Sequence, residues 1–111
     1  VCDKFMKSFK DGKFPEAIQL LKENSIMSHT LLDSVQVTIT DQMNNILPTY
    51  GKMLSYEFIT DKKIKDFYTK RFYILKLEYF CLTFHFSLYN NGTGWKITNF
   101  EYNEDLSELL N

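Results

Sequence analysis

The amino-acid sequence predicts a single α+β domain in which about three N-terminal helices pack on a four-stranded antiparallel meander sheet. Apolar side chains recur every three or four positions up to about residue 50, which is the period of an amphipathic helix. From Lys52 onward they alternate with polar side chains, as in a strand with one buried face. Because helices and strands are segregated along the chain, an α+β fold is favoured over a wound βαβ fold. The 111 residues fit one domain, residues 1–111.

Two short helices are expected before residue 26. The first ends at Asp11-Gly12. Pro15 suits the first turn of the second helix, where a missing N–H group is harmless, and Asn24-Ser25 closes that helix. The apolar stripes of this pair consist of Phe5, Met6, Phe9, Ala17, Ile18, Leu20 and Leu21.

Residues 28–50 fit two patterns. Residues 35–40 alternate like a strand, and their β-branched side chains lower helix propensity. Thr30 followed by Asp33 resembles the capping box of a helix. We expect a helix, because the helical spacing continues for two turns past the alternating residues before Pro48 marks the exit. The helical stripe consists of Leu32, Val35, Ile39, Met43 and Ile46.

Four strands with short connections are expected in the second half of the chain. Residues 61–63 form a polar turn after the first strand. The β-rich run of residues 66–89 is too long for one ordinary strand, so we expect a hairpin near residues 78–81 although the usual turn residues are absent. Residues 90–94, Asn-Asn-Gly-Thr-Gly, are the strongest turn pattern in the chain.

The last strand begins at Trp95. The change of parity between Ile97 and Phe100 predicts a β-bulge near Thr98-Asn99. Residues 105–110 could form a short terminal helical turn.

The strand over residues 81–89 has two contrasting faces. One face, expected to pack against the helices, consists of Leu82, Phe84, Phe86 and Leu88. The other face, expected to meet solvent or a partner, consists of Cys81, Thr83, His85, Ser87 and Tyr89.

Composition and charge narrow the classes of function. The chain is rich in aromatic residues and poor in Gly and Pro, which argues against disorder. Its net charge is −1, so no large basic footprint exists and nucleic-acid binding is disfavoured. The cations between Lys62 and Arg71 are diluted by Asp61 and Asp66, so we expect a solvated edge or loop there and no phosphate track.

No cofactor or metal ligand set is predicted. Cys2 and Cys81 do not have the spacing of metal ligands. A disulfide between them stays open as an alternative. The simpler interpretation is that Cys81 is a buried thiol in the sheet and Cys2 an incidental thiol near the end of the chain. His29 and His85 are isolated. Residues 92–94 are too short and wrongly placed for a nucleotide-binding loop. No apolar stretch reaches transmembrane length, and no signal peptide is visible.

Three motifs carry a family resemblance. They are Phe9-x-x-Gly12-x-Phe14 between the first helices, Tyr50-Gly51-Lys52 at the helix-to-strand junction, and the final hairpin Phe86-x-Leu88-Tyr89-Asn90-x-Gly92-x-Gly94-Trp95-Lys96-Ile97-x-x-Phe100. With this element order, the chain resembles the nuclear transport factor two-like superfamily, which has a cone-shaped, cystatin-like fold. The final hairpin is similar to that of small uncharacterised bacterial members, often lipoproteins or exported proteins.

The resemblance implies a curved sheet that can leave a small apolar pocket at the mouth of the cone. It also implies homodimerisation through the sheet and an exported or cell-envelope location. Enzymatic members place Asp, His or Tyr in the pocket, but no motif here transfers such a role residue by residue.

His85 is the main candidate for a ligand-binding residue, because it is a titratable side chain in an aromatic strand. Tyr73, Tyr79 and Tyr89 are in possible cross-strand reach, and His with Tyr could do acid–base work in a buried pocket. No Asp or Glu shares the strand, so a His at an exposed or dimer surface is the simpler expectation.

Two carboxylates, Glu57 and Glu78, are predicted within strands, where alternation places both on a solvated face. The candidate ligand-binding residues are therefore His85, Tyr73, Tyr89 and Glu57, and the candidate interface residues are Thr83 and Ser87. No catalytic residue is assigned. The leading hypothesis is a noncatalytic binding or protein-interaction domain; the alternative is a small-molecule isomerase, dehydratase or hydrolase acting in the cone pocket.

Overall fold

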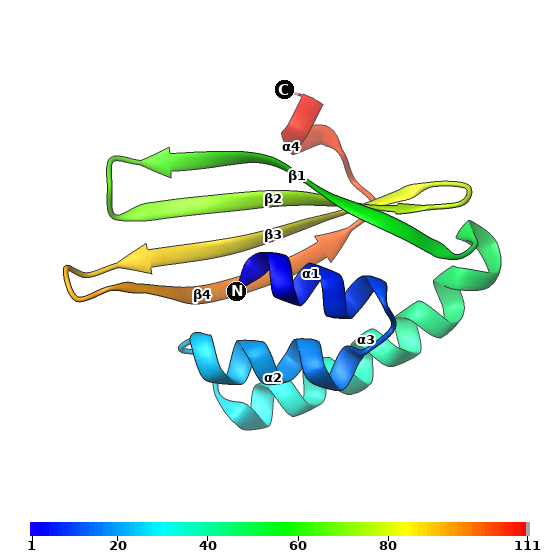
Figure 1. Cartoon of the computed structure of the whole chain (residues 1–111), viewed down its shortest axis with the longest axis horizontal. Helices are drawn as coiled ribbons and strands as arrows, with labels where there is room; N and C mark the ends of the chain where they lie inside the picture. The colour runs from blue at the N-terminus through cyan, green and yellow to red at the C-terminus, as the bar shows by residue number, and fades with distance from the viewer. Residues whose placement is uncertain (111) are drawn as a thin grey trace.

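The computed structural model describes residues 1–110 and confirms the α+β fold. Three helices come first, one four-stranded antiparallel sheet follows, and a short helix comes after it (Figure 1). None of the helices in this described range is long and apolar enough to cross a membrane. In chain order the elements are α1 (Cys2–Lys10), α2 (Phe14–Asn24), α3 (His29–Tyr50), β1 (Met53–Ile64), β2 (Tyr68–Leu77), β3 (Cys81–Asn90), β4 (Trp95–Asn103) and α4 (Ser107–Leu110).

The sheet is open and has the strand order β1-β2-β3-β4, so β1 and β4 are its edges. Figure 1 shows α1, α2 and α3 gathered on one side of the sheet and α4 apart from them. The β1–β2 and β3–β4 turns lie together at one end of the sheet, beyond the start of α1 (Figure 1). The helices therefore leave part of the sheet without a helical cover.

The turn predicted at residues 61–63 is wrong. β1 continues to Ile64, and the chain reverses over residues 65–67. Asp61 stays in the strand because it lies opposite Arg71 on β2. The Arg71 Nε and Nη2 atoms lie 2.9 and 3.2 Å from the two Asp61 carboxylate oxygens, a bidentate pair that fixes this register.

The other two turns and the bulge are confirmed. Residues 78–80 join β2 to β3, as the length of the β-rich run predicted. In the final hairpin, the Asn90 side chain accepts hydrogen bonds from the N–H groups of Gly92 at 2.8 Å and Gly94 at 3.2 Å. Thr98 is the extra residue of the bulge, because the register of β3 with β4 shifts by one there.

Helix α3 runs without interruption through the segment whose alternation also fitted a strand, so the helical prediction is confirmed. Its N-cap differs from the predicted box of Thr30 and Asp33. The hydroxyl of Ser28 accepts a hydrogen bond from the Leu31 N–H at 3.1 Å and so caps the helix. Asp33 instead pairs with Lys22 of α2, which ties the two helices together.

The junction of α3 with β1 depends on Gly51. Pro48 lies inside the last turn of the helix, and Gly51 follows with a φ of 84°, a conformation that side chains disfavour. A Cβ atom at this position would lie 2.6 Å from the Cβ of Glu78. Glu78 lies in the β2–β3 turn, not within a strand as predicted, and its carboxylate accepts a hydrogen bond from the Lys52 N–H at 2.9 Å.

The core lies between the sheet and helix α1, and the predicted inward face of β3 is confirmed. The ring of Phe84 packs edge-on against Phe9 at 4.8 Å between centroids, and Phe86 packs against Phe5 at 5.3 Å. These four rings are all fully buried. Their contact explains the high aromatic content, because large rings supply the apolar area that a small domain needs.

The opposite face of β3 was expected to be wet or interfacial, and this expectation is wrong for its middle. Thr83 is 5% exposed, His85 8% and Ser87 7%, and their neighbour Phe72 on β2 is fully buried. Residues 105–108 lie over this part of the sheet, with α4 reaching Lys62 and Lys70. The two ammonium groups lie 5.3 and 5.6 Å from the Phe72 ring centroid and help to cover it.

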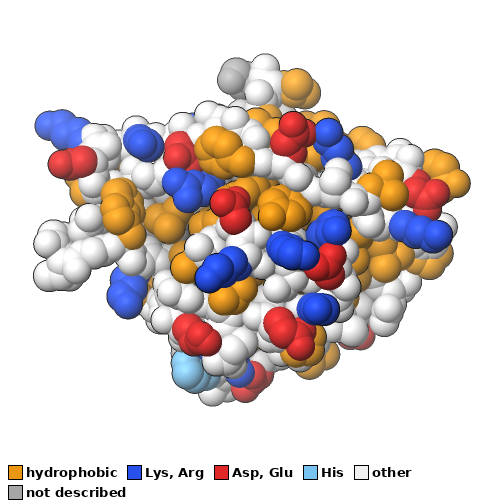
Figure 2. Space-filling model, in the orientation of Figure 1, with side chains coloured by type: hydrophobic (Ala, Val, Ile, Leu, Met, Phe, Trp, Pro, Cys, Tyr) orange, Lys and Arg blue, Asp and Glu red, His pale blue; other side chains and the backbone are white. Residues whose placement is uncertain are grey.

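Charges on the sheet are largely compensated. Besides the Arg71–Asp61 pair, Lys70 pairs with Glu108 at 3.1 Å and Lys76 with Glu57 at 2.9 Å. Figure 2 shows positive and negative side chains interspersed over the face turned to the viewer, with apolar side chains between them.

The two cysteines are both free, and their predicted roles are reversed. Cys2 is buried in the core at the start of α1, whereas Cys81 at the start of β3 is only half-buried. Burial raises the pKa of the Cys2 thiol, and the nearby Arg71 opposes this rise. Cys2 is therefore a packing residue.

Candidate functional site

His85 lies in the middle of β3, on the face of the sheet opposite α1. Across the sheet it pairs with Phe72 on β2 and Glu101 on β4. The imidazole packs against the Phe72 ring at 5.5 Å between centroids, and its Nε2 lies 3.6 Å from a carboxylate oxygen of Glu101. The acidic neighbour that β3 itself lacks is thus supplied by the adjacent strand.

Glu101 could have been found from the sequence. The final turn joins Asn90 to Trp95 as a pair, and counting outward with one extra residue for the bulge at Thr98 brings Glu101 opposite His85. Register and bulge together, and not strand composition, specify cross-strand neighbours.

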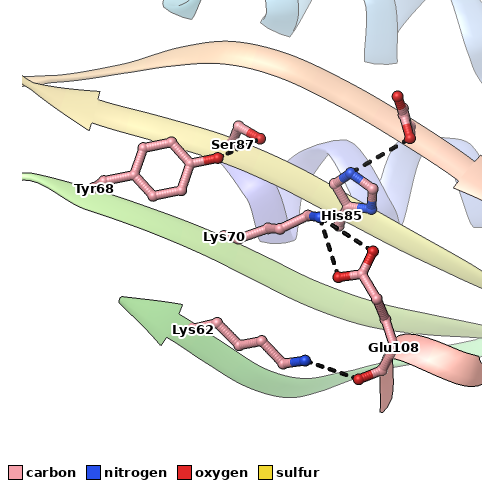
Figure 3. A network of polar contacts seen from close by, with 7 residues as sticks. Lys62, Tyr68, Lys70, His85, Ser87 and Glu108 are labelled. Atoms are coloured by element: carbon pink, nitrogen blue, oxygen red, sulfur yellow. Dashed lines mark hydrogen bonds and ion pairs between the residues drawn. The ribbon is translucent and has the colours of Figure 1, made fainter. Parts of the chain in front are cut away.

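The segment after β4 encloses the cluster from outside (Figure 3). The Lys70 ammonium lies 3.1 Å from both carboxylate oxygens of Glu108, and the Lys62 ammonium donates to the Glu108 carbonyl at 2.8 Å. Deeper in, the Thr83 hydroxyl donates to the carbonyl of Asp105 at 3.1 Å. These contacts attach residues 105–108 to the sheet.

Burial is the main influence on His85. It lowers the pKa of the imidazole, and the positive charge of Lys70 lowers it further. The carboxylates of Glu101 and Glu108 oppose this, but do not reverse it. The imidazole is therefore neutral at pH 7, with one nitrogen able to accept a hydrogen bond.

Tyr73 does not join His85. It lies on the helix-facing side of β2, opposite Phe84. Its hydroxyl donates to the Asp3 carboxylate at 2.6 Å, and burial with this hydrogen bond raises its pKa. Tyr73 thus anchors α1 to the sheet.

The other predicted residues lie apart from His85 or are already engaged. Tyr89, 46% exposed, lies toward the end of the strand, and Tyr79 lies in the β2–β3 turn at 74% exposure. Glu57 is exposed on β1 and pairs with Lys76, and both groups of this pair lie outside the cluster. The hydroxyl of Ser87 receives a hydrogen bond from Tyr68 at 3.2 Å (Figure 3).

The space beside His85 is small. The hollow between this residue, Phe72, Thr83 and the covering segment has a volume of about 50 Å³. This is far below the roughly 300–1,000 Å³ of typical small-molecule pockets. Within residues 1–110, no three His, Cys, Asp or Glu side chains gather as a metal site. The cluster is thus best explained as a buried polar layer that attaches the C-terminal segment.

A larger concave surface lies between α3 and β4. Two hollows of about 300 and 360 Å³ meet at Gln42 and Tyr102. We call them together the α3–β4 groove. Its apolar lining consists of Met27, Val35, Ile39, Ile46, Leu82, Phe100 and Tyr102, and its polar lining of Ser34, Thr38, Gln42, Asn45, Glu101, Asn103 and Glu104.

Gln42 and Tyr102 form the bridge across the groove. The Tyr102 hydroxyl donates to the side-chain oxygen of Gln42, which holds α3 at a fixed distance from β4. Burial raises the pKa of Tyr102 to about 12, so the hydroxyl stays protonated and keeps donating at neutral pH. This groove was not among the sites predicted from the sequence, because the helical period of α3 indicates an apolar stripe but not the strand that lies beside it.

Comparisons of this chain with protein-family models, with curated protein sequences and with solved structures found no match.

Proposed function

We propose that this protein is a noncatalytic interaction domain that binds an extended segment of a partner protein in the α3–β4 groove. The observation that carries the proposal is the groove itself, two adjoining hollows that share Gln42 and Tyr102 beside an edge strand. The partner segment would present apolar side chains and at least one positive charge.

The shape of the groove favours an extended occupant. β4 is the last strand of the sheet, and its Ile97 carbonyl accepts a hydrogen bond from the Ile26 N–H at 3.0 Å. Beyond that contact, the strand edge is available within residues 1–110 for hydrogen bonds with an added backbone. Side chains of such a segment would alternate into the groove.

The charge of the groove favours a positive segment. Its lining includes the carboxylate of Glu104, which accepts a hydrogen bond from the Tyr50 hydroxyl, but no Lys or Arg. Helix α3 contains no Lys or Arg at all, while the Glu101 carboxylate lies toward His85 on the other face. Complementary charge contributes mainly to partner choice and association rate, while the apolar floor supplies affinity. A partner segment with a positive charge and apolar side chains would match both the acidic lining and the apolar floor of the groove.

The enzymatic alternative has less support. It needs His85 or a carboxylate beside Tyr hydroxyls in a cavity, but Tyr73 lies on the other face and the hollow at His85 holds about 50 Å³. The contact between His85 and Glu101 is explained by a structural role, which needs no substrate.

Fluorescence anisotropy with a labelled peptide of alternating Val and Lys tests the proposal, and a Val–Glu peptide is the charge control. We expect the Val–Lys peptide to bind and the Val–Glu peptide to bind at least about tenfold more weakly, a difference of about 1.4 kcal/mol. Amide shifts in ¹⁵N spectra should cluster at Val35, Gln42 and Tyr102.

Thr38→Arg and Thr40→Arg form a matched pair of variants. Both threonines are exposed on α3, and each hydroxyl bonds the carbonyl four residues earlier. Only Thr38 lines the groove. Thr38→Arg should abolish peptide binding and Thr40→Arg should retain it; equal effects of the two, or no binding by the wild type, would refute the proposed site.

The homodimer and the exported location remain predictions from the family resemblance. Thr83 and Ser87, the predicted interface residues, are buried within the chain, so a dimer would have to use other parts of the sheet. Edge pairing through β1 is discouraged by register breaks at Leu54 and Ile59. Light scattering after size exclusion tests the dimer, and a monomer mass at micromolar concentration would refute it.

A further inference from the structure

A row of side chains crosses all four strands on the helix-facing side near the two hairpin turns. Lys63 on β1 pairs with Thr69 on β2, Thr69 with Leu88 on β3, and Leu88 with Ile97 on β4. This row lies toward the end of the sheet that extends past the start of α1 (Figure 1). No helix fills the space above its first three members, as the cavity there shows.

The cavity has a volume of about 330 Å³ and is lined by Lys63, Thr69, Arg71, Leu88 and Trp95. We call it the basic hollow. Leu88 and Trp95 form an apolar wall, with Trp95 still 45% exposed. The volume lies near the lower end of the range of roughly 300–1,000 Å³ for small-molecule pockets. A ligand of a few carbon atoms with one polar group fits this space.

The hollow has a surplus of positive charge. Arg71 lines the hollow and donates two of its N–H groups to Asp61; a guanidinium has five, so further donors remain. Lys63 adds a second cation. An adjoining depression of about 180 Å³ continues along Arg71 and Trp95 to Lys96. Within residues 1–110, no carboxylate lies within 4 Å of the Lys63 or Lys96 ammonium.

We propose that the basic hollow binds a small organic anion, a carboxylate on a short apolar body. Lys63 and the remaining N–H donors of Arg71 bind the carboxylate, and the body packs on Leu88 and Trp95. Asp61 holds the guanidinium in place, because a bidentate pair fixes its plane. This site is separate from the α3–β4 groove and stands whether or not that groove binds a partner.

Trp95 provides a direct readout, because it is the single tryptophan of the chain. Its fluorescence is followed while octanoate, 1-octanol or inorganic phosphate is added to the wild-type protein. We expect a saturable change with octanoate and about tenfold weaker binding of octanol, the scale of one charge-assisted hydrogen bond. Phosphate, which lacks the apolar body, should also bind more weakly than octanoate.

Lys63→Gln and Lys62→Gln are matched variants, because the two lysines are adjacent on β1 and change the net charge equally. Lys62 lies on the opposite face, over Phe72. Lys63→Gln should weaken octanoate binding about tenfold and leave octanol binding unchanged, while Lys62→Gln should change neither. Equal affinities for octanoate and octanol, or equal losses in the two variants, would overturn the proposal. Amide shifts at Thr69 and Leu88 in the wild type provide a second measurement that needs no variant.

Discussion

Phe84→Ala is the substitution for which the structure gives the clearest magnitude. The Phe84 ring is fully buried, packs edge-on against Phe9 at 4.8 Å and stacks on Tyr102 at 5.1 Å with an interplanar angle of 16°. Removing a buried Phe costs about 3–5 kcal/mol, because apolar transfer energy is lost and a cavity remains. Both ring pairs vanish as well, which favours the upper part of that range.

Phe67→Ala is the matched control, since the same atoms are removed at a site in the β1–β2 turn that is 41% exposed. Its cost should stay at about 1 kcal/mol. Urea unfolding followed by circular dichroism and by Trp95 fluorescence gives both free energies of unfolding. In thermal melts, Phe84→Ala should lower Tm by roughly 12–20 °C, at about 4 °C per kcal/mol for a domain of this size.

The two variants compare the loss of a buried Phe side chain with the loss of a half-exposed one. If Phe84→Ala and Phe67→Ala differ by less than about 1 kcal/mol, the placement of the β3 inward face against α1 is wrong. The groove and the basic hollow would then be misplaced too, because both depend on which side of the sheet the helices cover.

Gly51→Ala should lower the free energy of unfolding in urea melts more than Gly92→Ala does. Both glycines have positive φ, but only a Cβ at Gly51 would clash, because it would lie 2.6 Å from the Cβ of Glu78. Equal losses in the two variants would contradict the close packing at the junction of α3 with β1. For His85, whose folded pKa is lowered by burial and by Lys70, the sign of the pH effect follows from linkage. The unfolded chain binds more protons than the folded one as pH falls below about 6.5, so stability present above that pH is lost toward acid. His85→Gln should flatten this dependence in pH-resolved melts. In NMR titrations Lys70→Met should raise the pKa of His85, because it removes a nearby cation. Glu101→Gln should lower the pKa of His85, because it removes a nearby carboxylate. Shifts of the opposite sign would contradict the arrangement of charges around His85.

The sequence predicted the elements well where one pattern dominated. The helical period identified α3 despite its β-branched residues, because a stripe ending in Ile46 continues after the alternation stops. The final turn and the bulge at Thr98 followed from Asn-Gly chemistry and from parity. The turn at Asp61 was misplaced because charged residues in an edge strand have the same composition as a turn, and only the pairing of Asp61 with Arg71 distinguishes them.

The candidate site was less accessible from the sequence. Parity placed His85 and Tyr73 correctly on their own strands, but their opposite faces emerge only from the register of β2 with β3. The burial of His85 depends on a segment some twenty residues later folding back over it through Glu108.

Local periodicity and turn chemistry were sufficient to predict the α+β class, the order of the elements and the inward-facing residues of β3. Tertiary structure alone decided the α3–β4 groove and the basic hollow. The groove lies between α3 and β4, which are distant along the chain, and the hollow lies where the helices stop covering the sheet. No local sequence pattern predicts which part of the sheet the helices cover, because this depends on how the helices pack against the strands in three dimensions.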